Sequence, residues 1–178
     1  MAILFRHADR RFGFTWETPG QPPARYHGVG EGPVQYFADT PDGAWAEFLR
    51  HEEITDADEL DGIERRIWAV EVPDDDLASV MDVALPHATV VGGVDTYGAC
   101  RDAARQARAA GRGGIRAPSA ALIDGGGWAS GVAGLGPATP RPAEVVALFG
   151  TGAHWRGWMC HDTGSPHPSL LPLVRSAH

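Results

Sequence analysis

A strand that runs directly into a capped helix, over residues 33–52, constrains the fold of this chain more than any other feature. Its first seven residues alternate along the chain as expected for a strand, and Tyr36 lies on one of the two faces. Thr40 suits the N-cap position, Pro41 suits the first helical position, and Asp42 complements the positive end of a helix dipole. The sequence therefore predicts a short strand and a helix joined without an intervening loop.

The remaining segments predict a mixed architecture. Strands are predicted over residues 2–5, 66–72 and 144–149, and a second helix over residues 97–110. No internal repeat or linker divides the 178 residues, which suffice for one hydrophobic core. We expect a single compact α+β domain with a small mixed or antiparallel β core and flanking helices. Residues 1–150 would form its main body, and residues 151–178 a C-terminal extension packed on the same domain.

Composition and charge exclude several classes of partner. The formal net charge is −8, and the basic residues form no long patch, which disfavours direct binding to nucleic acid. No stretch approaches the ~20 apolar residues of a membrane span, and the N-terminal apolar run is too short for a signal peptide. Cys100 and Cys160 lie far apart in the sequence, and we expect two free thiols. These observations predict a cytoplasmic protein.

Three residues in and before the strand–helix unit are candidates for ligand binding. Arg25 precedes a loop with glycines, where a guanidinium can face phosphate oxygens. Tyr36 is either part of the core or a platform for a ring. Glu47 lies in the least polar part of its helix, so it is either paired with a structural arginine or held for function. A cation, an aromatic ring and a carboxylate suit an anionic ligand that carries a positively charged ring, as NAD does.

Residues further along the chain narrow the possible chemistry. Ser119 follows Pro118 without a surrounding Gly-x-Ser-x-Gly, which favours a hydrogen-bonding role over that of a hydrolase nucleophile. The glycine-rich runs do not follow the strand, turn and helix order of a dinucleotide-binding fingerprint. The polar residues of the C-terminal segment match no known zinc spacing, so we predict no metal site. These residues are His154, Cys160, His161, Asp162 and His167.

Taken together, these elements resemble the RES domain, a family named for its arginine, glutamate and serine. The resemblance covers about residues 4–149 and depends on the order and spacing of its pieces. The resemblance matches Arg25, Glu47 and Ser119 to the family arginine, glutamate and serine. The family's Arg-Trp-Asn is Arg25-Tyr26-His27 here, which leaves open whether Arg25 or Tyr26 takes the site position. The pieces are Arg25-Tyr26, G-P-V-Q-Y ending at Tyr36, A-W-A-E-F-L-R-H with Glu47, and G-I-R-A-P-S with Ser119.

The resemblance implies an ADP-ribosyltransferase-like fold and an enzyme that consumes NAD as its substrate, without a metal. It implies Glu47, Arg25 and Ser119 as catalytic residues, and Arg25, Tyr26, Tyr36 and Ser119 as residues that bind NAD. Many members are toxins of bacterial toxin–antitoxin pairs, so a cognate antitoxin is the implied partner. The acceptor stays open between water, phosphate and a protein side chain. An enzyme of secondary metabolism and a catalytically silent binding module are the alternatives.

Overall fold

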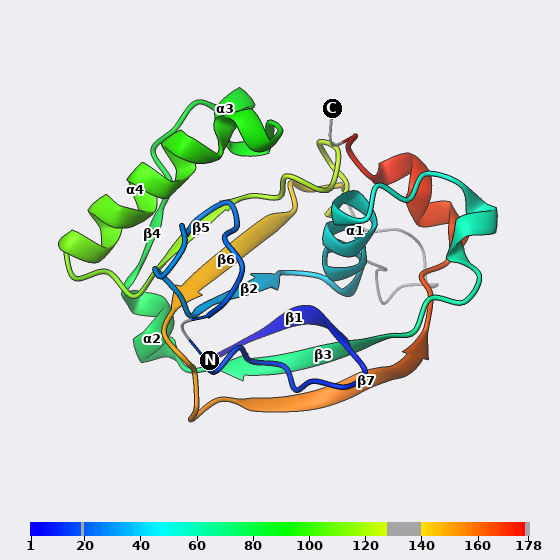
Figure 1. Cartoon of the computed structure of the whole chain (residues 1–178), viewed down its shortest axis with the longest axis horizontal. Coiled ribbons are helices and arrows are strands. Elements are labelled where there is room, and N and C mark those ends of the chain that lie inside the picture. The colour runs from blue at the N-terminus through cyan, green and yellow to red at the C-terminus, as the bar shows by residue number, and fades with distance from the viewer. Residues whose placement is uncertain (19, 128–139, 177–178) are drawn as a thin grey trace.

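The computed structural model describes residues 1–18, 20–127 and 140–176, which form one seven-stranded sheet (Figure 1). The strand order is β4-β5-β6-β2-β1-β3-β7, and all neighbours are antiparallel except the parallel pair β4 and β5. This mixed sheet confirms the predicted α+β class. The strands are β1 (Ala2–Asp9), β2 (Val34–Ala38), β3 (Arg65–Val72), β4 (Val80–Asp82), β5 (Gly114–Pro118), β6 (Glu144–Phe149) and β7 (Arg156–Gly164).

Two of the α-helices in the described part of the chain are long enough to build a core. In Figure 1, α1 lies over the middle of the sheet, whereas α4 lies beside β4 and β5 together with the short helix α3. None of the helices in residues 1–18, 20–127 and 140–176 has the length and apolar character that crossing a membrane requires. The helices are α1 (Pro41–His51), α2 (Asp74–Ala78), α3 (His87–Val91) and α4 (Tyr97–Ala109), with 3₁₀ turns η1 (Ala57–Leu60), η2 (Val94–Thr96) and η3 (Pro168–Leu173).

The alternation of strand residues divides the hydrophobic core between the two faces of the sheet. On β6, Ala147 packs into the cluster under α4, whereas its neighbours Val146 and Leu148 pack into a cluster with Leu4 and Trp155. A third cluster lies around α1 and includes residues of the C-terminal turn η3. Both faces of the sheet are therefore covered, and this explains why β6 reads as a nearly continuous apolar run.

The sheet is almost divided between β1 and β2. The pairing of β1 with β3 extends over eight residue pairs, but β1 and β2 are joined by the single pair Phe5 and Ala38. Strands β4, β5, β6 and β2 thus form one half of the sheet, and β1, β3 and β7 form the other. The gap between the halves lies below α1, and the main cleft of the molecule opens there.

Local contacts explain why α1 begins where the sequence predicts. Thr40 is in an extended conformation, and its Oγ1 accepts a hydrogen bond of 2.9 Å from the backbone N–H of Gly43. A Cβ atom at Gly43 would lie 2.9 Å from the Cβ of Ala38, so the glycine lets the helix start close to the end of β2. The predicted cap and the predicted strand–helix junction are both confirmed.

Two strands extend beyond the sequence prediction. β1 continues to Asp9, four residues past the predicted end, because its pairing with β3 satisfies the backbone of polar residues that carry no strand pattern of their own. β7 occupies part of the C-terminal extension, for which the sequence predicts no regular structure. It is an edge strand with mostly exposed side chains, so burial does not impose an alternating pattern on it.

We predict that Thr40→Ala lowers the free energy of unfolding by about 1 kcal/mol, because the first turn of α1 loses its side-chain cap. In a domain of this size that loss corresponds to a fall in Tm of roughly 2–4 °C. Thermal unfolding followed by circular dichroism measures it. Thr40→Ser keeps the hydroxyl and is the matched control, and equal losses for both variants would contradict the capping role.

Candidate active site

The main cleft has a volume of about 440 Å³ and lies where β1 and β2 separate beneath α1. Four of the five residues that the sequence singles out line it, and they come from a loop, from β2 and from α1. They are Arg25, Tyr26, Tyr36 and Glu47. The fifth, Ser119, lies behind the wall formed by its neighbours Pro118 and Ala120.

Glu47 is a half-buried carboxylate at the centre of this arrangement. No arginine, lysine or histidine lies within ion-pair distance of Glu47 in the described part of the chain. Burial raises its pKa, and the charges of Arg25 and Arg50 and a hydrogen bond from Ser119 partly oppose that rise. The group is thus poorly solvated and surrounded by cations that do not neutralise it through direct contact. Carboxyl groups with such raised pKa values are often found at functional sites.

Ser119 supports Glu47 from behind. Its hydroxyl donates to Glu47 Oε1 at 3.3 Å and accepts from the backbone N–H groups of Ala121 at 3.1 Å and Leu122 at 3.2 Å. The side chain is 4% exposed, and its hydrogen-bonding capacity is used within the protein. The structure therefore brings Ser119 to the predicted glutamate, and a direct contact between Ser119 and a ligand stays a prediction.

Arg25 and Arg50 together hold the loop that follows α3. Both donate to the carbonyl of Gly92, from Nη2 at 2.9 Å for Arg25 and at 3.1 Å for Arg50. Arg50 also donates to the carbonyl of Ala120 at 2.5 Å, and the guanidinium of Arg25 lies 4.6 Å from the centre of the Tyr97 ring. These contacts fix two positive charges on the wall of the cleft, and both charges act on Glu47.

Tyr36 anchors the segment that carries Arg25. Its hydroxyl accepts from the backbone N–H of Tyr26 at 3.0 Å and shares a hydrogen bond of 2.9 Å with Nδ1 of His27. The rings of Tyr26 and Tyr36 are stacked with centroids 6.4 Å apart. Tyr26 is 1% exposed, whereas Arg25 is half-buried. Of these two neighbouring residues, Arg25 is therefore the more exposed.

The structure also brings residues into the cleft that sequence reasoning did not select. Arg50 lies three positions after Glu47 on α1, and this helical spacing was a signal that could have found it. Arg6 and His7 come from the part of β1 that the sequence leaves outside its predicted strand. Burial and nearby positive groups lower the pKa of His7 to about 3, so its imidazole is neutral at physiological pH.

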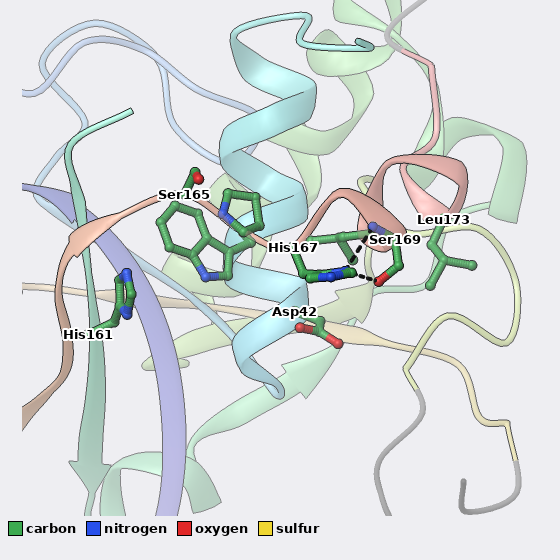
Figure 2. A pocket seen from close by; sticks show the side chains of 9 residues that line it. Asp42, His161, Ser165, His167, Ser169 and Leu173 are labelled. Carbon is green, nitrogen blue, oxygen red and sulfur yellow. Dashed lines mark hydrogen bonds between the residues drawn. The ribbon is translucent and has the colours of Figure 1, made fainter. Parts of the chain in front are cut away.

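A second, smaller cavity of about 210 Å³ lies at the N-terminal end of α1, between that helix and the C-terminal segment (Figure 2). Trp45 and Asp42 of α1 border it together with His161 and His167. Figure 2 shows the two histidines well apart, with Nδ1 of His167 bonded to the hydroxyl of Ser169 at 2.8 Å. Within the described ranges no group of histidine, cysteine and acidic side chains is arranged to hold a metal ion.

The comparison with protein families identifies the class of this domain. The model of the RES domain matches residues 3–157, which is most of the chain. The chain therefore belongs to the RES domain family. No curated protein sequence matches it.

A solved structure has a similar fold. A chain of the MbcT–MbcA toxin–antitoxin complex of M. tuberculosis superposes with a TM-score of 0.57 at 14% sequence identity. The match covers 96% of the present chain and 87% of that chain. At 14% identity this comparison supports the fold alone. Any inference about the reaction must come from the residues that line the cleft.

We predict that Glu47→Gln raises Tm by up to a few degrees near neutral pH, because the variant removes a carboxylate whose ionised form the folded state disfavours. About 1 kcal/mol corresponds to roughly 2–4 °C in a domain of this size. The pKa of Glu47 is raised above its ordinary value of 4.5, so the cost of ionisation is absent at lower pH and appears as pH rises through and beyond 4.5.

Thermal unfolding at pH 4 and at pH 8 tests this sign. The wild type and the Glu47→Gln variant are expected to agree more closely at pH 4 than at pH 8. Glu144→Gln, which removes an exposed carboxylate, is the matched control. A Tm difference that grows as pH falls would contradict the raised pKa.

Proposed function

We propose that this protein is an NAD-consuming enzyme that cleaves the bond between nicotinamide and ribose. The observation that carries the proposal is a half-buried, unneutralised carboxylate, Glu47, that faces a cleft with arginines on its walls in a RES domain. The cleft volume of about 440 Å³ lies within the ~300–1,000 Å³ that is usual for pockets that bind small molecules. NAD combines the negative charge of a diphosphate with the positive charge of a pyridinium ring. The cleft presents arginines that would attract the first and a carboxylate that would attract the second.

The proposed chemistry is the breaking of a glycosidic C–N bond. The electron pair leaves with nicotinamide, and positive charge builds on the ribose ring, as in glycoside cleavage. An acceptor oxygen then bonds to the anomeric carbon and gives up its proton. Glu47 would stabilise the developing charge more than it stabilises the bound substrate, and this difference is what accelerates the reaction. Nicotinamide leaves as a neutral molecule, so the mechanism needs no strong acid.

The neighbouring residues take supporting roles in this proposal. Arg25 would bind the pyrophosphate through N–H groups that Gly92 does not occupy, and Tyr36 would stack on the nicotinamide ring. Ser119 would orient Glu47 through its hydrogen bond of 3.3 Å, and through that contact act on the ribose. Tyr26 would shape the wall beside Arg25.

The biological role proposed is that of the toxin of a bacterial toxin–antitoxin pair, silenced by a cognate antitoxin. Membership of the RES family and the fold shared with a chain of a toxin–antitoxin complex support this role. The reaction is proposed as hydrolysis, phosphorolysis or ADP-ribosyl transfer. A nicotinamide-release assay with and without phosphate separates the first two, and labelled NAD incubated with cell extract reveals transfer to a protein.

Two alternatives compete with this role. An enzyme of secondary metabolism would release nicotinamide without harming the cell that expresses it. A silent binding module would need Glu47 to be neutralised by a structural arginine, but its hydrogen bond comes from Ser119 and both lie beside an open cleft. The geometry thus favours an active site over a silent one. Toxicity on expression, relieved by a partner encoded beside it, separates the toxin from the metabolic enzyme.

We predict that Glu47→Gln lowers the rate of nicotinamide release from NAD by roughly 10²- to 10³-fold, the usual loss when one group that stabilises a transition-state charge is removed. The variant keeps the shape of the side chain, and the hydroxyl of Ser119 can still reach an oxygen. The Glu144→Gln variant serves as the control for the loss of a carboxylate. Undiminished NAD loss in Glu47→Gln would exclude the proposed role.

We predict that Ser119→Ala lowers kcat by about 10- to 100-fold with a much smaller change in KM, because a hydrogen bond to a charged group is lost at a residue outside the cleft wall. The loss removes a contact that holds down the pKa of Glu47, so the acidic limb of the kcat profile moves to higher pH. Ser79→Ala removes a hydroxyl bonded to the carbonyl of Asp76 and is the control. An unshifted acidic limb would contradict the orienting role of Ser119.

A further inference from the structure

Arg6 is a half-buried arginine on β1 that lines the same cleft. Its Nη1 donates to Oε1 of Gln35 at 2.7 Å across the gap between the two halves of the sheet. Gln35 is fully buried, and its amide is saturated: Oε1 also accepts from the N–H of Trp16 at 2.7 Å, and Nε2 donates to the carbonyls of Trp16 at 2.7 Å and Gly150 at 2.9 Å. The amide cannot turn without losing these bonds, so Arg6 is held in one orientation.

The charge on Arg6 has no counter-ion in the described ranges of the chain. None of the ion pairs found there involves Arg6. Burial lowers the pKa of the guanidinium to about 10, and Tyr36 partly opposes this fall, so Arg6 is charged at neutral pH. A buried charge without a partner is costly to the fold. The arrangement is therefore complementary to an anion that enters the cleft.

The other two arginines of the cleft, Arg25 and Arg50, are bonded mainly to backbone carbonyls of the protein itself. Arg50 is bound to three backbone carbonyls, and Arg25 is bound to the carbonyl of Gly92 and stacked on Tyr97. Of the five N–H donors of the Arg6 guanidinium, Gln35 takes one. Arg6 thus keeps more of its donors for a ligand than Arg25 or Arg50 does.

We propose that Arg6 is a second binding residue, beside Arg25, for the phosphate groups of the ligand, and that Gln35 is its positioning residue. The inference deepens the proposed function and rests on it where the ligand is NAD, because it assigns the diphosphate of that substrate to the β1 side of the cleft. A planar guanidinium can bind two oxygens of one phosphate at once, and its fixed orientation lowers the entropic cost of doing so.

The test is calorimetric binding of inorganic pyrophosphate and of ADP-ribose to the full chain and to two uncharged variants, Arg6→Met and Arg6→Gln. Both variants are expected to weaken binding by roughly 10- to 100-fold, the loss typical of a hydrogen-bonded charge. Arg112→Met, which removes an exposed arginine outside the cleft, is the control and is expected to bind as the wild type does. Arg6→Gln guards against misfolding of the methionine variant, because it keeps a polar contact with Gln35.

A stability measurement separates a ligand-binding role from a structural one. Arg6→Met removes an unpaired buried charge, so its ligand-free Tm is expected to equal or exceed that of the wild type. Binding of pyrophosphate by the two folded Arg6 variants as tight as in the wild type would overturn the inference, and so would a wild type that does not bind pyrophosphate at millimolar concentration. A protein that binds pyrophosphate through Arg6 but does not cleave NAD would overturn the proposed function and leave this inference standing.

Discussion

The structure depends on the incomplete contact between β1 and β2. One residue pair, Phe5 and Ala38, joins the two halves of the sheet, and the cleft exists because the strands separate beyond it. Where two strands separate, their polar groups lose the partners that strand pairing would supply. The buried amide of Gln35 provides partners here: it accepts from Arg6 on β1 and bonds to the backbone of Trp16 and Gly150. The contacts that bridge the gap thus also fix the position of Arg6 in the wall of the cleft.

Helix α1 places Glu47 and Arg50 over this gap. Its first turn is fixed at the end of β2 by the Thr40 cap, so the position of Glu47 relative to the strands is set by a short, rigid connection. Glu47 and Arg50 then lie on the part of the helix that faces the cleft, and Ser119, the residue after the end of β5, supports the carboxylate. The site lowers the stability of the fold, because a carboxylate with a raised pKa and an arginine without a counter-ion among the described residues both oppose folding.

Sequence reasoning succeeded where the signal is local. The strand–helix junction, strand β6 and helix α4 were all predicted to within about two residues, because caps and apolar runs act on their own neighbours. It failed at β7 and at the second half of β1. Both are strands because a partner strand pairs with them, and their own residues carry little strand pattern. Arg6 was not predicted as a cleft residue, because it lies in the part of β1 that the sequence prediction left out.

The sequence by itself determined the class of the protein and named the residues that are predicted to form its site. The order of Arg25, Glu47 and Ser119 along the chain identified the RES domain, since family motifs are properties of spacing. Only the tertiary structure decided which of these residues face the cleft and which stand behind it. Exposure, pairing and the pKa of a carboxyl group depend on contacts between segments far apart in the chain, and no local pattern records those contacts. That is why Ser119 proves to hold Glu47, and why Arg6 enters the site from a strand that the sequence had ended too early.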